Sequence, residues 1–319
     1  MSKSTLLTCL LGAGIALALL ATVMVHGGDF AGAGVVIAIA AWLVLWLACS
    51  IWSGVPQNAG GWFGRIRDVG IMLTFGITLI FLWEILCIGF GVPAVLLPAP
   101  SLIGARVASS YPLIAGDFVQ TVIRAAIPGW AIGSLAGFLT ALLCDRCDFL
   151  RRGLLPIGNL VSALPMIGLA PILVMWFGFD WQSKAAMVVV MTFFPMLVNT
   201  IAGLGEAGAI ERDLMRSYGA SWSETLLALR LPAAMPMIFN ALKINSTLAL
   251  IGAIVAEFFG TPLVGLGFRI STEVGRMALD TVWACIAVAA VTGSAFYGVL
   301  VLAERRVTFW HPSIRQRTQ

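Results

Sequence analysis

Eight runs of about 20 largely apolar residues dominate this sequence, and their length restricts its fold more than any other feature. A helix of that length crosses the roughly 30 Å hydrocarbon core of a bilayer and satisfies its own backbone hydrogen bonds there. Of the 319 residues, 60% are hydrophobic and 11% charged, which excludes an ordinary soluble globular chain with about 25% charged residues. We therefore predict an all-α, polytopic membrane protein with about eight transmembrane helices. The runs lie near residues 5–25, 34–53, 71–92, 120–143, 157–177, 185–204, 236–258 and 281–303.

The first apolar run follows Lys3 and superficially matches a secretory signal peptide. It is longer than the apolar region of roughly 7 to 15 residues in such peptides, and no clear cleavage site precedes His26. We therefore expect this run to be a retained transmembrane helix.

Lysine and arginine residues fall unevenly on the two sides that alternate loops define. Thirteen of them belong to the N-terminus, to the loops near 54–70, 144–153 and 205–235 and to the C-terminal tail, whereas four belong to the opposite side. Because positive residues concentrate in cytoplasmic loops, we expect both termini in the cytoplasm. The net charge of +4 thus reflects membrane orientation and does not indicate a nucleic-acid partner. The four residues expected outside are Arg106, Lys184, Arg269 and Arg276.

The six cysteines indicate neither a disulfide framework nor a metal site. Four lie within apolar runs, where a thiol behaves as a small hydrophobe. Cys144 and Cys147 form a CxxC, but a second pair is missing and the two histidines, His26 and His311, lie far away in the sequence. No combination of nucleophile, base and metal ligand appears, so we predict no catalytic residue and no bound metal.

The sequence gives no support for nucleotide binding by this chain. Gly203, Gly205 and Gly208 match GxGxxG, but they follow an apolar helix rather than a strand, so we predict no dinucleotide site. The sequence contains no Walker A motif. We expect this chain to bind no cofactor itself, so any ATP and magnesium that drive it belong to a partner subunit.

The longest polar-rich run between two apolar stretches extends from 211 to 236 and reads ERDLMRSYGASWSETLLALRLPAAMP. Its first part, from about Ile210 to Tyr218, fits a short amphipathic helix. Gly219 can adopt the left-handed conformation that closes a helix.

A second helix is expected after this glycine. Ser221 followed by Glu224 matches a capping box, and we expect the helix that it opens to end near Pro232. The expected object is a bent pair of short helices on a membrane surface, built to contact another protein. The side chains expected to face outward are Leu214, Met215, Tyr218 and Trp222.

This run resembles the cytoplasmic coupling loop of ATP-binding-cassette (ABC) importer permeases. The family pattern is Glu-Ala-Ala, three residues, Gly, nine residues, then Ile-x-Leu-Pro. Asp213, Leu214 and Met215 take the first three places, Gly219 takes the glycine, and residues 229–232 take the last four without a gap. Asp213 is one methylene shorter than the family's glutamate, which puts its ionic contact in question.

Other segments are similar to the nitrate, sulfonate and taurine branch of the binding-protein-dependent transport system inner-membrane family. The resemblance covers roughly residues 70–305 and is best between 163 and 267. The segments that carry it are Leu97–Ser101, Ala163–Met166, Trp176–Gly178, Phe194–Met196, Asn199–Thr200, Val255–Glu257 and Gly265–Gly267.

The resemblance implies the permease subunit of an ATP-driven importer in the bacterial inner membrane, with no enzymatic activity of its own. Its implied partners are two cytosolic ABC ATPase subunits, a second permease copy in a homodimer, an extracytoplasmic solute-binding protein and membrane lipid. The implied solute is a small anion of the nitrate, sulfonate or taurine kind, or a small heteroaromatic vitamin precursor. The implied ATPase-coupling residues are Asp213, Leu214, Met215, Tyr218, Gly219, Leu231 and Pro232.

Two other functions stay open at this point. An ion-driven secondary transporter needs several intramembrane carboxylates or broken helices around an ion site, and only Glu84 is well placed for that. A membrane-embedded enzyme is the third possibility. One assay separates the ATP-driven importer from the ion-driven secondary transporter. ATP-driven transport stops without ATP and persists when the proton gradient is collapsed.

A glycine-rich stretch at 54–70 separates the first two apolar runs from the other six. We predict two extra transmembrane helices and a linker in residues 1–60, and a cytoplasmic tail in 311–319. Residues 61–310 form a six-helix core of the type I ABC importer kind, with a coupling loop at 206–236. The extra helices pack on the core, assist assembly or contact a partner, and the sequence leaves these roles open. Residues 101–113 are expected to form a short interfacial helix.

Two further predictions concern the spans. Gly129, Gly133 and Gly137 repeat every four residues, so they allow close approach of another helix, within or between subunits. Glu84 is expected to pair with Arg124, because a charge within a bilayer needs a partner; the alternative is that Glu84 touches solute. Of the other ionisable residues in spans, Glu257 is expected near an outer end and Lys243 is expected to reach the cytoplasm.

Overall fold

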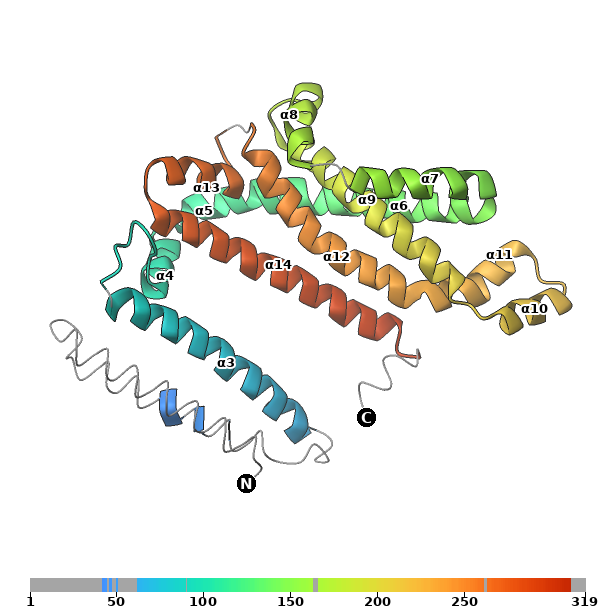
Figure 1. Ribbon diagram of the computed structural model, residues 1–319, viewed down its shortest axis with the longest axis horizontal. Helices are drawn as coiled ribbons and strands as arrows, with labels where there is room; N and C mark the ends of the chain where they lie inside the picture. Colours follow the sequence, from blue (N-terminus) through green and yellow to red (C-terminus); the bar gives the residue numbers. More distant parts are fainter. Residues whose placement is uncertain are drawn as a thin grey trace. The chain divides into compact units, whose positions relative to one another are not determined.

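The computed structural model describes residues 42–44, 46–47, 50, 62–89, 91–162, 166–260 and 263–310. The described residues are helical and contain no strand, which confirms the all-α prediction. The first apolar run, most of the second and the C-terminal tail lie outside them. Figure 1 labels the α-helices. The elements, including the two π-helical segments η1 and η2, are α3 Trp62–Gly89, α4 Pro100–Ser109, α5 Tyr111–Phe118, η1 Val119–Ala126, α6 Ile127–Arg146, α7 Asp148–Ser162, α8 Met166–Phe177, α9 Trp181–Gly205, α10 Ala209–Ser217, α11 Trp222–Thr225, η2 Leu226–Arg230, α12 Leu231–Glu257, α13 Leu266–Gly275 and α14 Leu279–Val307.

Among the described residues, five helices are long and apolar enough to cross a membrane. Two of them consist of consecutive elements: α5, η1 and α6 form one helix of 36 residues, and α11, η2 and α12 form another of the same length. In the predicted span at 157–177, the structure describes the end of α7 and the whole of α8, helices of 15 and 12 residues, and residues 163–165 between them lie outside the described part. The five spans are Val69–Ile88, Tyr111–Arg146, Trp181–Gly205, Trp222–Glu257 and Leu279–Val307.

The chain divides into two compact units, residues 1–106 and 107–319. The first contains α3 and most of α4, and its boundary falls later in the sequence than the expected boundary at residue 60. Within it, the Trp42 indole donates to Thr78 Oγ1 at 2.8 Å, and the Trp42 ring stacks on Phe81. These contacts attach the described part of the second apolar run to α3.

The second unit is organised around α9, which packs against both α6 and α12. Three glycines of α6, Gly129, Gly133 and Gly137, face α9 of the same chain. A Cβ on Gly129 would lie 2.5 Å from Val188 Cβ, and one on Gly133 would collide with Thr192 Oγ1. The close approach thus lies within one subunit and depends on the missing side chains.

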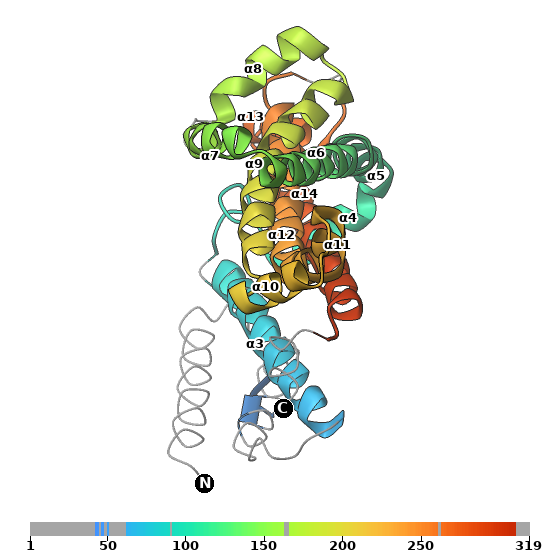
Figure 2. The same cartoon turned by 90° about the vertical axis from the view of Figure 1, so that its right-hand side faces the viewer.

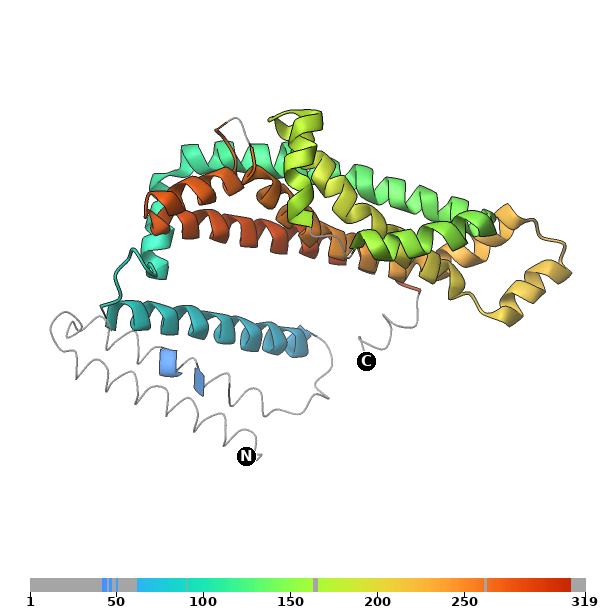
Figure 3. The same cartoon turned by 45° about the horizontal axis from the view of Figure 1, so that its top comes forward.

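The remaining elements of the second unit cover its ends. A chain reversal at Cys147 ends α6, and α7 then runs back beside it, with Leu150 and Leu154 packed on the α6–α9 contact. In Figures 1 and 3, α8 stands across the long helices. In Figure 2, α10 and α11 lie at the end of the unit that faces the viewer.

Two lysines are placed differently from expectation. Lys243 does not extend freely into solvent; its Nζ lies 2.8 Å from Glu304 Oε2 of α14, and both side chains are only about 15% exposed. Lys184 does not lie in a loop; it belongs to the first turn of α9, is buried, and donates to the Phe179 carbonyl at 2.6 Å. Both departures follow from the cost of an unpartnered charge near lipid, which a nearby acceptor removes.

Candidate functional site

The short helix α10 extends from Ala209 to Ser217 and projects from the end of the second unit. None of its nine residues, all of which the structure describes, is buried. The side chains of Ile210, Leu214 and Tyr218 are 84%, 55% and 80% exposed. Large apolar groups held in the open mark a surface that another molecule covers.

Gly219 closes α10 as the sequence predicts. Its φ is +70°, and the Ala220 and Gly219 amides donate to the carbonyls of Met215 and Arg216 at 3.0 and 2.9 Å. This is the hydrogen-bond pattern of a Schellman motif, in which a residue in the left-handed conformation ends the helix. The chain therefore turns sharply between α10 and α11.

The predicted capping box at the start of α11 is confirmed. The Ser221 hydroxyl accepts from the Glu224 amide, and the Glu224 carboxylate accepts from the Ser221 amide at 2.7 Å. Two of the amides that a helix start leaves without partners are thereby satisfied.

The expectation that this second helix ends near Pro232 is wrong. The helix continues from Trp222 through η2 and α12 to Glu257 without a break. Proline lacks an amide hydrogen and crowds the carbonyl four residues before it. The π-helical turn η2, Leu226–Arg230, ends two residues before Pro232 and includes Ala228, so it widens the helix where that crowding would occur. Hence α11 is the first turn of a membrane span rather than a separate short helix.

The expectation that Trp222 faces outward is also wrong. Its indole Nε1 donates to Asp145 Oδ2 at 3.3 Å, and the Arg146 guanidinium lies 5.0 Å from the ring centroid. The ring also packs against the buried cluster that includes Leu226. Trp222 therefore attaches α11 to the end of α6, since ring and guanidinium attract each other.

An ion pair strengthens this attachment. Arg230 donates through Nη1 and Nη2 to both carboxylate oxygens of Asp145, at 2.7 and 2.5 Å, and through Nε to the Leu204 carbonyl at 3.2 Å. The side chains of Arg230 and Asp145 are only 15% and 10% exposed. One arginine thus joins η2 to the last turns of α6 and α9. Sequence reasoning missed this pair, because its members lie 85 residues apart.

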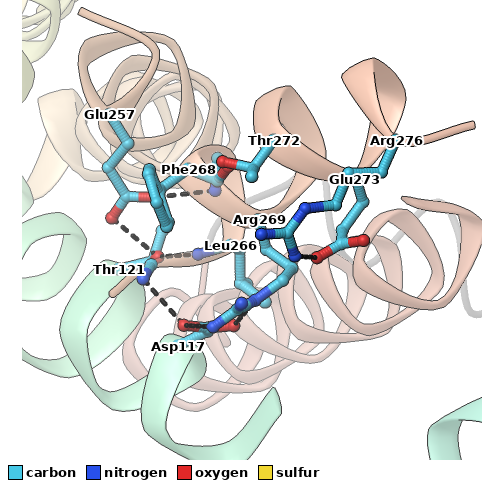
Figure 4. Close-up of polar contacts among 11 residues, drawn as sticks. Asp117, Thr121, Glu257, Leu266, Phe268, Arg269, Thr272, Glu273 and Arg276 are labelled. Atoms are coloured by element: carbon cyan, nitrogen blue, oxygen red, sulfur yellow. Dashed lines mark hydrogen bonds and ion pairs between the residues drawn. The ribbon is translucent and has the colours of Figure 1, made fainter. Parts of the chain in front are cut away.

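A second polar cluster lies at the other end of the unit. Asp117 of α5 accepts from the Gly265 amide and from Arg269 of α13, at 2.8 and 2.9 Å. Figure 4 shows the two charged side chains pointing toward each other. Hydrogen bonding to this carboxylate raises the pKa of Arg269 above its ordinary value. Asp117 is 1% exposed, so the pair is a buried anchor between α5 and α13.

Glu257 completes this outer cluster. It is 2% exposed and accepts from the Thr121 hydroxyl at 2.8 Å and from the Gly267 amide at 2.7 Å (Figure 4). The Thr121 hydroxyl in turn accepts from the Leu266 amide. The carboxylate at the end of α12 thus holds the start of α13. Sequence reasoning placed Glu257 near an outer end but did not find these partners.

Comparison with known proteins identifies the family. Residues 133–309 match the model described as the binding-protein-dependent transport system inner membrane component, which is more than half of the chain. The chain belongs to this family. It is therefore a multi-pass permease component of an ABC transport system in the inner membrane, and such a permease is not an enzyme.

Individual relatives agree with this family assignment. This permease is 30% identical to a probable ABC transporter permease protein of Haemophilus influenzae over 222 residues, which is 70% of this chain and 89% of the relative. It is 32% identical to the formylaminopyrimidine transport permease protein ThiX of Halalkalibacterium halodurans, with 61% and 77% covered. It is 28% identical to the riboflavin transport system permease protein RibX of Chloroflexus aurantiacus, with 77% and 91% covered. Further relatives are named for sulfonate, taurine and nitrate transport, which confirms the branch resemblance.

The residues carried over from the family's coupling loop fall into two groups in this permease. Asp213, Leu214 and Tyr218 belong to the exposed part, and Met215 is half-buried beside them. Asp213 is 73% exposed and lies 3.6 Å from Arg216 of the same helix. Two residues, Leu231 and Pro232, are half-buried at the start of α12, and Leu231 packs against the buried cluster that includes Leu226.

The proposed pair of Glu84 and Arg124 stays a prediction, since its members belong to separate units of the permease. Each has a partner within its own unit. The carboxylate of Glu84 accepts from the Ser101 amide at 2.9 Å and from the Ser101 hydroxyl, at the start of α4. Arg124 Nη1 lies 3.4 Å from Gln120 Oε1, one turn earlier in η1.

Proposed function

We propose that this permease forms the membrane pathway of an importer for a small solute, and that separate ATPase subunits dock on α10. The observation that carries the proposal is the contrast between α10 and α11. The former presents exposed apolar side chains, whereas the latter continues through η2 into α12, and Trp222 and Arg230 of this continuous helix bond to the ends of α6 and α9.

This contrast supports a mechanical role. ATP binding to a partner can shift an inward–outward equilibrium only through contacts that differ between the two states. A partner that moves α10 also moves Gly219 and the first turn of α11, which is continuous with α12. Through Arg230, the same displacement reaches α6 at Asp145 and α9 at Leu204.

The proposed assembly contains two such ATPase subunits, which bind ATP and magnesium, and a second copy of this permease. Several cationic residues support a cytoplasmic location for the α10 end. They are Arg146, Arg212, Arg216, Arg230, Arg305 and Arg306. An extracytoplasmic solute-binding protein then docks at the opposite end, where α13 and the outer cluster lie.

We propose that the solute is a small anion of the nitrate, sulfonate or taurine kind, or a small heteroaromatic vitamin precursor. The names of the relatives support both classes, since they include sulfonate, nitrate, formylaminopyrimidine and riboflavin transport proteins. Identification of the solute carried by the matching binding protein distinguishes between the two classes.

Transport by reconstituted complex tests the proposed function. The permease, purified with its ATPase and supplied with the loaded binding protein, is expected to take up solute when ATP is enclosed with the ATPase. Uptake should stop without ATP and persist when a protonophore collapses the proton gradient. The reverse pattern would indicate an ion-driven transporter and overturn the proposal.

Retention of the ATPase on purified variants tests the docking surface. Asp213→Ala removes an exposed carboxylate of α10 and is expected to weaken attachment of the ATPase. Asp148→Ala is a matched control, because it removes an exposed carboxylate from α7 at the same end of the permease. Equal retention by both variants would show that Asp213 makes no contact.

A further inference from the structure

A cavity of about 600 Å³ opens beside the outer cluster, within the second unit. One face of the long helix lines it through Gly116, Gln120 and Arg124. Asp180, directly before α9, and Val264, in the segment between α12 and α13, complete its wall. Three separate parts of the chain therefore meet at this cavity, which is large enough for a small organic solute.

Arg124 brings a positive charge to this cavity. It lies within a membrane-spanning helix, about one turn from Thr121 of the outer cluster, and its side chain is exposed. Among the described residues its one hydrogen-bond partner is the neutral Gln120 amide, at 3.4 Å. A guanidinium carries five donors, so most of them remain available. A cation within a membrane span is costly, and it typically marks a solute or ion pathway.

The surroundings hold this arginine in place. Gln120 is 5% exposed, and its amide Nε2 donates to Asp180 Oδ1 at 3.1 Å, which leaves its oxygen for Arg124. The same Asp180 oxygen also accepts from the Trp181 amide. Gln120 and Arg124 both belong to η1, a π-helical segment of the kind that recurs at functional sites.

The opposite wall is fixed as well. Val264 precedes Gly265, whose amide donates to Asp117. The charge of Asp117 is balanced by Arg269, so this carboxylate does not neutralise Arg124. Asp180 is the acidic side chain in the lining itself, and its Oδ1 is already engaged by two donors.

We propose that Arg124 binds the acidic group of the transported solute, and that the solute is a small organic oxyanion such as a sulfonate or carboxylate. The inference rests on the proposed import function and selects the anion class from the two solute classes given above. The guanidinium forms two parallel charge-assisted hydrogen bonds to two oxygens of the acidic group. Gln120 positions the guanidinium and does not itself bind the anion.

Binding to the purified full-length permease tests this site without ATP, ATPase or binding protein, so its result is independent of the import assay. The probe is sodium ethanesulfonate, and the control ligand is ethyl methyl sulfone, in which a methyl group replaces the charged oxygen. Sodium chloride at equal ionic strength is the reference. A ligand that binds the folded state raises the thermal unfolding midpoint in a concentration-dependent manner. Ethanesulfonate should do so, and the sulfone should not.

Three variants test whether ethanesulfonate binds at Arg124. Arg124→Gln should raise the half-saturating concentration of ethanesulfonate by at least about tenfold, as expected for loss of a charged hydrogen-bond partner. Arg124→Lys should retain weaker binding, because it keeps the charge but not the fork of donors. Arg276→Gln is the matched control and should bind as the wild type does, since it removes an exposed arginine of the same end outside the cavity.

Several results would overturn the proposal. One is equal stabilisation by ethanesulfonate and the sulfone, or none by either. Another is unchanged ethanesulfonate binding by Arg124→Gln. If Arg124→Gln fails to fold, Gln120→Leu replaces it and should weaken binding, because the guanidinium loses its positioning partner. Restoration of a destabilised Arg124→Gln by Glu84→Gln would assign Arg124 to the predicted pair instead.

Discussion

Gly219 carries the backbone constraint on which the turn between α10 and α11 depends. Its φ is +70°, and a Cβ built on it would meet no described heavy atom within 4 Å. Any effect of a substitution therefore comes from the backbone rather than from a collision. The left-handed conformation costs a side-chain-bearing residue about 1–2 kcal/mol, with asparagine among the better-tolerated residues.

We expect Gly219→Val to reduce ATP-dependent solute uptake strongly, because a β-branched residue does not hold the turn that orients α10. Gly219→Asn is the matched control and should keep most of the activity. Uptake by reconstituted complexes measures both. Wild-type uptake by the valine variant would contradict the role of the turn.

Asp145 and Arg230 offer a second test at the scale of single residues. Arg230→Met leaves a nearly buried carboxylate without its two guanidinium donors, and loss of one partner of a buried pair costs about 3 kcal/mol or more. We expect the free energy of unfolding to fall by about that amount in detergent titrations.

The double variant is the control for this prediction. Asp145→Leu combined with Arg230→Met removes both charges and should recover most of the lost stability, since no uncompensated charge remains. If the double variant is less stable than Arg230→Met alone, the ion pair does not explain the loss.

At the scale of single residues, the contacts that the sequence predicted correctly join residues close together in the chain. The capping box links Ser221 and Glu224, three residues apart, and Gly219 acts through hydrogen bonds within its own turn. The contacts that attach α11 to the spans join residues about 80 positions apart, and the Thr121–Glu257 contact joins residues 136 apart. Such pairs are set by helix packing, which a single sequence does not reveal.

At the scale of elements, the continuous helix from Trp222 to Glu257 is the main departure from prediction. A proline near the membrane surface was expected to end a helix, yet Pro232 lies within this one after a π-helical turn. Proline is tolerated where the preceding carbonyl is displaced from its ring. The turn at Gly219 therefore leads directly into a span, which shortens the mechanical route from the proposed docking helix α10.

The α6–α9 contact gives a prediction for helix packing. Gly133→Ala places a methyl group against Thr192 Oγ1 and the Val189 backbone, so we expect a loss of about 1–3 kcal/mol in the free energy of unfolding. Detergent titration of the purified permease measures it. A Gly133→Ala variant as stable as the wild type would show that α6 and α9 separate easily.

Gly153→Ala is the control for that experiment. Gly153 is exposed on α7, and a Cβ there would meet no described atom within 4 Å. Because alanine favours helix more than glycine by up to about 1 kcal/mol, this variant should be as stable as the wild type or more so. A loss in both variants would indicate a general effect of the substitution.

The sequence predicted most of the long elements, because apolar runs of membrane length are unambiguous. It also predicted close packing by the α6 glycines, but not which helix they approach. The run at 157–177 was predicted as one span because it is largely apolar, and the structure describes two helices there, α7 and α8; length and apolar composition alone do not distinguish one span from two shorter helices.

At the scale of the whole second unit, the two polar clusters lie at opposite ends of the long helices. The outer one holds α5, α12 and α13 together, and the inner one holds α6, α9 and α11. The helix that includes Asp117 and Asp145 has 36 residues, or about 54 Å at 1.5 Å per residue. Rigid helices that are anchored at both ends are suited to carry a displacement from the docking surface to the solute cavity.

The central claim is that α10 faces the cytoplasm and binds a separate ATPase, and photo-crosslinking in native membranes tests it most directly. A benzophenone amino acid is placed at Tyr218, which is 80% exposed on the docking surface, and, as the control, at Trp176 of α8, which is 74% exposed. We predict a covalent adduct between position 218 and a subunit that binds ATP, and none from position 176. The absence of such an adduct at 218, or an adduct there with an extracytoplasmic protein, would contradict the account.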